Sequence, residues 1–347
     1  MKALSPAERR HYSDLLRHTE QSSVISEIPQ FFEAEIHPLR SASEHARDKL
    51  RVLVFNMERG VHLEEIKNYL GSHPLLSDTD IIIANELDLG CIRSGSKDTA
   101  KEIAEFLGMN YVYGLEFIEL VNEEDPKGFH GNAIFSRLPI EETKVLRLPE
   151  KYNWYFDRQK RIGSRNAILA KIDLGGKKIA LVCTHLENRT DGEGRRAQMR
   201  MIFEEAEKAF PGIPLIIGGD LNTNGFDGRD IDAIEALAKL YRDKERILIP
   251  DIFELCEKEM LLSDAKNLGY LRVPEDSGCT RRKPLPCGSY LPLSLDWILY
   301  RGLKLLEARI LSTETKDFGF AKPDSALAAF SLPELSDHNA VWACFQI

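Results

Sequence analysis

An acid and an amide stand two positions apart at the end of an apolar run in the segment PLIIGGDLN, residues 214–222. Side chains at positions i and i+2 of an extended chain point the same way, so Asp220 and Asn222 project together from the end of the expected strand. A buried carboxylate is costly unless a cation or hydrogen-bond donors lie beside it. Two interpretations fit the pair: a turn that closes the strand through local hydrogen bonds, or a site that does chemistry.

The same pattern recurs along the chain, and the recurrence favours a site. One polar residue at a strand end is well explained as a cap, a surface acid or a hydrogen-bonded core histidine. The packing of a domain does not require many such groups at once, so we infer that several strand ends supply one site. The groups are Asn56 and Glu58, Glu86, Thr184 and His185, Asp220 and Asn222, Asp296 within SLDWILY, and Asp337 with His338 before the last apolar run.

The elements that must position these groups are short strands with few helices between them. Such a pattern predicts an α/β or α+β sandwich of two packed sheets with helices outside. Because no low-complexity linker interrupts residues 50–347, we expect one catalytic domain there, and residues 1–49 as a helical N-terminal extension that begins at a capping box. Expected strands cover 51–56, 80–85, 111–120, 131–136, 166–174, 178–185, 214–219, 294–300, 303–311 and 340–347, and expected helices cover 98–107, 195–210 and 230–242.

The composition of the chain limits which partners it is expected to bind and in which compartment it is expected to work. The formal net charge of −9 disfavours a protein that coats nucleic acid regardless of sequence, but it leaves room for a local basic pocket. No signal peptide, no transmembrane run and no protein-partner motif is evident, and we expect a cytoplasmic protein. Cys183 and Cys344 are expected to be buried thiols in strands, with a disulfide or metal pair of Cys279 and Cys287 as the less favoured interpretation.

Seven short motifs in a fixed order carry a specific resemblance. FNMERG, DIIIANEL, GNAIFSRLPI, ALVCTHLE, IIGGDLN, SLDWILY and SDHNAV resemble the endonuclease/exonuclease/phosphatase superfamily of metal-dependent phosphohydrolases with the fold of pancreatic deoxyribonuclease. The resemblance covers about residues 50–347 and leaves 1–49 outside. It implies a four-layer sandwich, two packed mixed β-sheets flanked by helices, and hydrolysis of phosphate esters with Mg²⁺ or Mn²⁺.

The resemblance also implies a metal site. Glu86 matches the main metal ligand of the family, with Asn56 beside it, and Asp337 either completes the ligand set or serves a second metal position. Oxygen ligands of this kind suit Mg²⁺ or Mn²⁺.

Catalytic roles follow from the same matches. His338 is expected to act as general base or to polarise the phosphate, and Asp296 to hydrogen-bond the imidazole and raise its pKa. Asp220 would orient or deprotonate the attacking water, and whether Asp220 or His338 is the base stays open. Asn222 and His185 would donate hydrogen bonds to the phosphoryl oxygens.

Five further residues have weaker signals. Glu58 is either a second acid near the metal or a solvated strand end, and Asn132 is expected to support the site from behind. Arg165 follows the basic run Arg158, Lys160 and Arg161, which is either a solvated loop or a contact for an anionic substrate. Arg93, in a Gly/Ser-rich loop after Glu86, and Arg281, in a basic loop before Asp296, are further candidates for substrate contact.

The resulting prediction is a Mg²⁺- or Mn²⁺-dependent phosphoester hydrolase, most simply a phosphodiesterase acting on a small molecule or lipid head group. A nuclease acting on DNA or RNA is the alternative, and an inactive family member kept for binding is the least favoured. Inositol polyphosphate 5-phosphatases are disfavoured because Thr223 and Asn224 follow Asn222, and no Arg follows Trp297.

Overall fold

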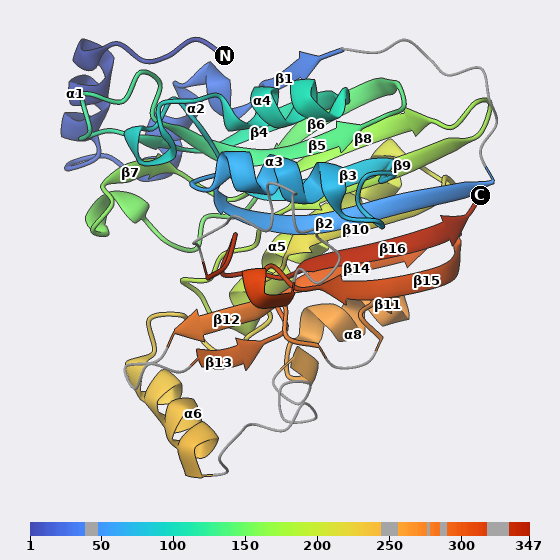
Figure 1. Cartoon of the computed structure of the whole chain (residues 1–347). Coiled ribbons are helices and arrows are strands. Elements are labelled where there is room, and N and C mark those ends of the chain that lie inside the picture. Colours follow the sequence, from blue (N-terminus) through green and yellow to red (C-terminus); the bar gives the residue numbers. More distant parts are fainter. Residues whose placement is uncertain (39–47, 244–255, 276–277, 285–289, 318–332) are drawn as a thin grey trace.

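Two large β-sheets lie face to face in the computed structural model, which describes residues 1–38, 48–243, 256–275, 278–284, 290–317 and 333–347 (Figure 1). The first sheet runs in the order β1-β4-β5-β3-β2-β16-β15, and β7 adds to the edge of β4. Only β2 and β3 pair in parallel among the described strands of this sheet. Its strands are β1 (Ala34–His37), β2 (Lys49–Arg59), β3 (Ile81–Leu89), β4 (Asn110–Glu119), β5 (Phe129–Ser136), β7 (Arg161–Gly163), β15 (Lys304–Leu311) and β16 (Ala340–Gln346).

The second sheet runs in the order β11-β14-β10-β9-β8-β6, and a separate two-stranded ribbon, β12-β13, lies near one end of it (Figure 1). Here β9 and β10 are the parallel pair. Both sheets are therefore mixed. The strands are β6 (Ile140–Arg147), β8 (Asn166–Asp173), β9 (Lys178–Thr184), β10 (Leu215–Asp220), β11 (Leu271–Val273), β12 (Arg281–Pro284), β13 (Tyr290–Leu293) and β14 (Asp296–Arg301).

Alternating side chains explain why the sheets stack into layers. In β2, Val52 and Val54 join the apolar core between the two sheets, whereas Leu53 and Phe55 join a second core on the outer face. Strand residues alternate between faces, so a strand that is apolar throughout must be covered on both sides. The helices supply that outer cover.

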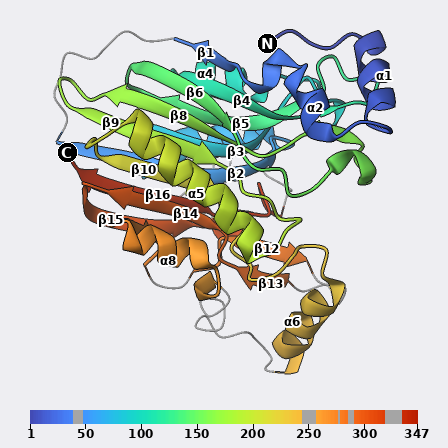
Figure 2. The ribbon, with the colours of Figure 1, turned by 180° about the vertical axis from the view of Figure 1, so that it is seen from behind.

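Helices cover the outer face of each sheet. The first sheet packs against α3 and α4 and the N-terminal helices (Figure 1), and the second packs against α5 and α8 (Figure 2). The expected four-layer sandwich, two mixed sheets flanked by helices, is confirmed. The helices are α1 (Pro6–Leu15), α2 (Gln21–Ser26), α3 (Leu63–Ser72), α4 (Thr99–Leu107), α5 (Gly192–Ala209), α6 (Ile231–Asp243) and α8 (Met260–Asn267), with short 3-10 turns at Pro29–Phe31, Ile92–Ser94, Trp154–Phe156 and Thr315–Asp317.

All ten expected strands are present, but the N-terminal extension is not wholly helical. Its α1 begins at the expected capping box of Ser5 and Glu8. Residues Ala34–His37, however, form β1 and pair with β4, so the helical expectation is wrong there. A four-residue edge strand obtains its hydrogen bonds from a partner distant in sequence, and local pattern does not reveal that. The division of the chain at residue 49 stays a prediction.

Other differences have local causes. Helix α5 starts at Gly192, three positions before the expected start, because the Asp191 side chain caps it by accepting from Gly194 N. Strand β6 was not expected, since it is an edge strand with charged exposed positions. Cys183 and Cys344 are buried free thiols as expected. Cys287 lies outside the described residues, so the interpretation that pairs it with Cys279 is untested. No described helix has the length and apolar character needed to cross a bilayer.

The two parallel pairs end at the same side of the sandwich, and this positions the candidate site. The end of β10 lies against the ends of β2 and β3, where Asp220 N donates to Asn85 Oδ1 at 2.8 Å. Gly218 and Gly219 permit this approach. A Cβ on Gly218 would lie 2.6 Å from Val54 Cγ2, and one on Gly219, at φ 141°, would lie 1.8 Å from the Thr184 carbonyl oxygen. The double glycine of the IIGGDLN motif thus serves the contact between sheets.

Candidate active site

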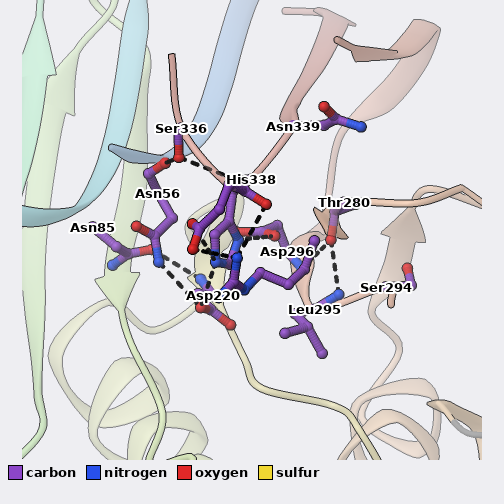
Figure 3. Close-up of polar contacts among 12 residues, drawn as sticks. Asn56, Asn85, Asp220, Thr280, Ser294, Leu295, Asp296, Ser336, His338 and Asn339 are labelled. Atoms are coloured by element: carbon purple, nitrogen blue, oxygen red, sulfur yellow. Dashed lines mark hydrogen bonds and ion pairs between the residues drawn. The ribbon is translucent and has the colours of Figure 1, made fainter. Parts of the chain in front are cut away.

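Three buried side chains form the centre of the candidate site: Asp220, Asp296 and His338 (Figure 3). The first two face each other as a register pair at the ends of β10 and β14. His338 Nδ1 lies 2.8 Å from Asp296 Oδ2, and His338 Nε2 lies 3.7 Å from Asp220 Oδ2. One nitrogen of the imidazole is therefore held, and the other is directed toward a second carboxylate.

Hydroxyl groups fix the backbone around this centre. Ser336 Oγ donates to the Asn56 carbonyl oxygen at 2.8 Å and accepts from His338 N at 3.1 Å. Thr280 Oγ1 accepts from Leu295 N and Asp296 N at 2.8 and 3.0 Å (Figure 3). The loop that carries His338 and the start of β14 are thus both tied in place. A site held by such supporting contacts loses less free energy to ordering when substrate arrives.

Glu86 and Asn56 form the opposite side of the site. Asn56 Nδ2 donates to Glu86 Oε1 at 3.3 Å and to Asp220 Oδ2 at 3.2 Å. Both β2 and β3 have irregular register at this point, and Glu86 has the left-handed φ of 55°. A non-glycine residue in that region is strained, and such strain concentrates at functional sites. The irregularity turns the Glu86 carboxylate toward the site.

Asn85 joins the two sheets at the site, and the sequence interpretation missed this role. Its Oδ1 accepts from Asp220 N, and its Nδ2 donates to the Thr184 carbonyl oxygen and to Asn132 Oδ1, both at 3.0 Å. Asn132 in turn donates to Asn166 Oδ1 at 3.1 Å, so it lies behind Asn85, and its support of the site stays a prediction. An amide inside an otherwise apolar run was the available signal, because buried polar groups need partners.

His185 and Asn222 lie on either side of Asp220. His185 Nε2 is 3.4 Å from Asp220 Oδ2, while its buried Nδ1 has no hydrogen bond among the described residues. Asn222 N donates to Asp220 Oδ1 at 2.9 Å, and Asn222 Nδ2 donates to the Leu186 carbonyl oxygen at 2.9 Å. One amide hydrogen of Asn222 is therefore engaged, and no described residue accepts the other. Donation by either residue to a phosphate stays a prediction.

Burial shifts the protonation equilibria of the central groups. Burial, and then the charge of Asp296, raises the pKa of Asp220 to about 7, and burial raises the pKa of Asp296 to about 8. Burial also lowers the pKa of His338. Loss of water outweighs the favourable charges of Asp220, Asp337 and Glu86 around the ring. The separate effect of Asp296 on the pKa of this histidine stays a prediction.

The donor set fits a hard divalent cation. Burial alone would raise the pKa of Glu86, but His185, His130 and Arg59 hold it well below its ordinary value, so the group is ionised at neutral pH. Its side chain is 23 % exposed. Asp296 Oδ1 is buried without a hydrogen bond among the described residues. The ionised Glu86 carboxylate and the Asn56 amide beside it offer oxygen donors of the kind that Mg²⁺ or Mn²⁺ prefers.

Asp337 and Glu58 lie beside this group. Asp337 Oδ1 is 3.7 Å from His338 Nε2, and Asp337 N donates to Glu58 Oε2 at 3.1 Å. The Asp337 carboxylate is also paired with Arg281, which was expected to contact substrate. Arg281 thus lies at the edge of the site, but one of its nitrogens is already engaged by a candidate metal ligand.

Arg165 is buried in a separate ionic cluster. Its Nη1 donates to Glu116 Oε2 at 3.2 Å, and its Nε lies 3.4 Å from Glu187 Oε2. His185 Nδ1 lies 3.8 Å from the same Glu116 oxygen, so the cluster borders the site. Arg165 also lines a cavity next to Glu86.

The structure does not bring Arg93 into the group around His338. Its Nε and Nη2 donate to Asp88 at 2.7 and 2.9 Å, and its Nη1 donates to Glu119 at 2.8 Å. The arginine therefore holds the loop after β3 against the first sheet.

We expect Asp88→Ala to lower the free energy of unfolding by about 3 kcal/mol, since it leaves a partly buried guanidinium without its bidentate partner. Asp88 is fully buried and also accepts from His130 Nδ1 at 2.8 Å. Urea unfolding at pH 7 measures the effect, with the exposed Asp14→Ala as control. A loss below about 1 kcal/mol in Asp88→Ala would contradict the structural role of this pair.

A family model matches the part of the chain that carries the candidate site, and a curated relative matches a shorter stretch of the chain. The model of the Endonuclease/Exonuclease/phosphatase family matches residues 53–338, which include every residue of the central group. An uncharacterized Escherichia coli K12 protein, YbhP, is 30% identical over 122 residues, which is 35% of this chain and 42% of YbhP. The chain thus matches less than half the length of that relative.

Solved structures show the same fold at low identity. The human Nocturnin catalytic domain with a bound sulfate anion is 18% identical, with a TM-score of 0.54 over 92% of this chain and 98% of that one. D. rerio TDP2 in complex with a single-strand DNA product is 14% identical, with a TM-score of 0.52 over 87% and 100% of the two chains.

Proposed function

Because the chain belongs to the Endonuclease/Exonuclease/phosphatase family, we propose that it is a phosphoester hydrolase that depends on Mg²⁺ or Mn²⁺. The observation that carries the proposal is the placement of His338. Its imidazole is held by Asp296 at 2.8 Å and directed at Asp220, across from the Asn56–Glu86 pair. A base, an acid and an ionised carboxylate thus converge on one point.

Glu86 would hold the metal, with Asn56 beside it and Asp337 as a further oxygen donor. A bound divalent cation supplies neutralisation of the charge on the phosphoryl oxygens. Asn56 has a second role, because its Nδ2 keeps Glu86 and Asp220 together. The Asp337 carboxylate would have to exchange its pairing with Arg281 to contribute.

The remaining groups would handle protons and phosphate oxygens. Asp220 and His338 face the same space, so one of them takes the proton of the attacking water while the other donates a hydrogen bond to the phosphate. Asp296 is a positioning residue that holds the imidazole in one orientation. His185 and the second amide hydrogen of Asn222 would stabilise negative charge as it grows on the phosphoryl oxygens.

The proposed substrate is a phosphodiester of a small molecule or lipid head group, in a cytoplasmic protein with no protein partner required. The net charge of −9 supports this over a nuclease, which needs several phosphate contacts along a strand. The TDP2 structure with a single-strand DNA product keeps a nuclease as the second candidate.

A substrate panel with metal titration tests the function. We expect hydrolysis of bis-p-nitrophenyl phosphate or of one natural phosphodiester in the presence of Mg²⁺ or Mn²⁺, and loss of at least about 100-fold in rate in excess EDTA. Restored Mg²⁺ should recover the rate in the same sample, which excludes unfolding as the cause. No hydrolysis of any phosphomonoester, phosphodiester, DNA or RNA with either metal would overturn the proposal.

A further inference from the structure

A cavity of about 480 Å³ adjoins the candidate site, and Glu86 is part of its wall. Two carboxylates, Glu86 and Asp157, face five guanidinium groups among its lining residues, so cations predominate in a chain whose net charge is negative. The arginines come from β2, from β7 and the segments on either side of it, and from the loop after β9. They are Arg59, Arg158, Arg161, Arg165 and Arg189.

Arg161 has no ionic partner among the described residues although it is only 4 % exposed. Its guanidinium lies 3.9 Å from the ring centroid of Phe117 and 4.1 Å from that of Trp154. Aromatic faces attract a cation, but they replace its lost hydration only in part. Glu119 and Glu187 favour this charge only from beyond ion-pair distance. A buried charge with no directly paired counter-ion, at the wall of a cavity, indicates a place for an anion.

The other four arginines are only partly neutralised by the described carboxylates. Arg165 is balanced by Glu116 and Glu187 behind it. Arg189 Nη2 lies 3.8 Å from Asp157 Oδ2, a weak pairing, and the side chain of the exposed Arg158 has no partner among the described residues.

Arg59 links the cavity to the candidate metal site. Its Nε lies 3.9 Å from Glu86 Oε2, which is too long for a hydrogen bond. Where Glu86 holds a cation, its charge is no longer available to balance Arg59. Metal binding would therefore make the cavity more positive, which joins the two sites electrostatically.

We propose that this cavity binds a second phosphate group of the substrate, in addition to the phosphate that is cleaved. The proposal rests on the proposed function and narrows its substrate class to small phosphodiesters that carry a terminal phosphate monoester. Guanidinium groups bind phosphate oxygens through paired hydrogen bonds, and several around one cavity favour a dianion over the single charge of a backbone phosphate. A cavity next to Glu86 also places the second phosphate on the same molecule as the first.

The cavity is tested without metal or catalysis by titrating the protein with inorganic pyrophosphate in the presence of EDTA at low salt. Isothermal titration calorimetry measures the binding. We expect saturable 1:1 binding that weakens at least about tenfold in Arg161→Gln and in Arg158→Gln. Arg158 is exposed and packs little, so its variant keeps the test valid where Arg161→Gln fails to fold. The matched control is Arg309→Gln, whose arginine is exposed on β15 and paired with Glu307, and which should bind as the unaltered protein does.

Absence of binding, or equal weakening in the control, would overturn the second phosphate site. Displacement of pyrophosphate by an oligonucleotide without a terminal phosphate, at a similar concentration of phosphate, would overturn the small-molecule substrate class. Pyrophosphate binding in a protein without hydrolytic activity would leave the cavity assignment standing and remove the proposed function. Hydrolysis that pyrophosphate does not inhibit, together with no binding of pyrophosphate, would leave the proposed function standing and remove the cavity assignment.

Discussion

Glu86→Gln is expected to lower kcat/KM for phosphodiester hydrolysis at least about 10³-fold, because it removes the ionised oxygen best placed to hold the metal. The amide keeps the size of the side chain and can still accept from Asn56 Nδ2, so the fold should persist. Direct titration with Mn²⁺ gives a readout besides activity. Its dissociation constant should rise at least about tenfold in the variant.

Two comparisons make the result on Glu86 specific. Glu64→Gln, on the exposed face of α3, should leave both activity and Mn²⁺ affinity unchanged. An unchanged melting temperature in Glu86→Gln excludes loss of structure. A variant that keeps more than about a tenth of the activity at saturating metal would show that Glu86 is not the principal ligand.

His338→Ala is expected to lower kcat about 10³-fold, which is within the range for removal of a general acid or base. Among the described residues, only this side chain joins the two carboxylates, with Asp296 at 2.8 Å and Asp220 at 3.7 Å. Because the loss concerns the chemical step, KM should change much less than kcat. Steady-state kinetics on the substrate found in the panel measures both constants.

Asp296→Asn separates positioning from proton transfer at the same histidine. An amide of the same shape can hold the ring, but its preferred hydrogen-bonding pattern can select the other tautomer, so we expect a smaller loss of kcat than in His338→Ala. The exposed His18→Ala serves as control. Near-complete activity in His338→Ala would leave Asp220 as the only candidate base.

Asp220 and Asp296 show which features of the site the local sequence pattern could predict. The sequence placed Asp220 and Asp296 in two strands because alternating apolar residues are a local property. The two acids lie side by side because the register between β10 and β14 makes them direct partners. Register depends on packing between segments far apart in the chain, so the effect of Asp296 on the pKa of Asp220 could not be read from either motif.

Arg93 and Arg161 show what local pattern does not reveal about a basic residue. Arg93 stands in a Gly/Ser-rich loop near Glu86 and was expected to meet substrate, yet Asp88 and Glu119 engage its guanidinium. Arg161 stands in a basic run for which a solvated loop was the default interpretation, yet it is buried against Phe117 and Trp154 at a cavity wall. Sequence gives the charge of an arginine but not its partners, which are set by the sheets around it.

By itself the sequence determined the sandwich of apolar strands, the order of the seven motifs and the residue types at each strand end. These follow from burial and alternation, which act over a few residues. Only the tertiary structure decided that Asn85 joins the sheets beside Asp220, that Ala34–His37 adds an edge strand, and that five arginines surround one cavity. Each of these depends on contacts across many residues, for which the local pattern of a chain carries no physical signal.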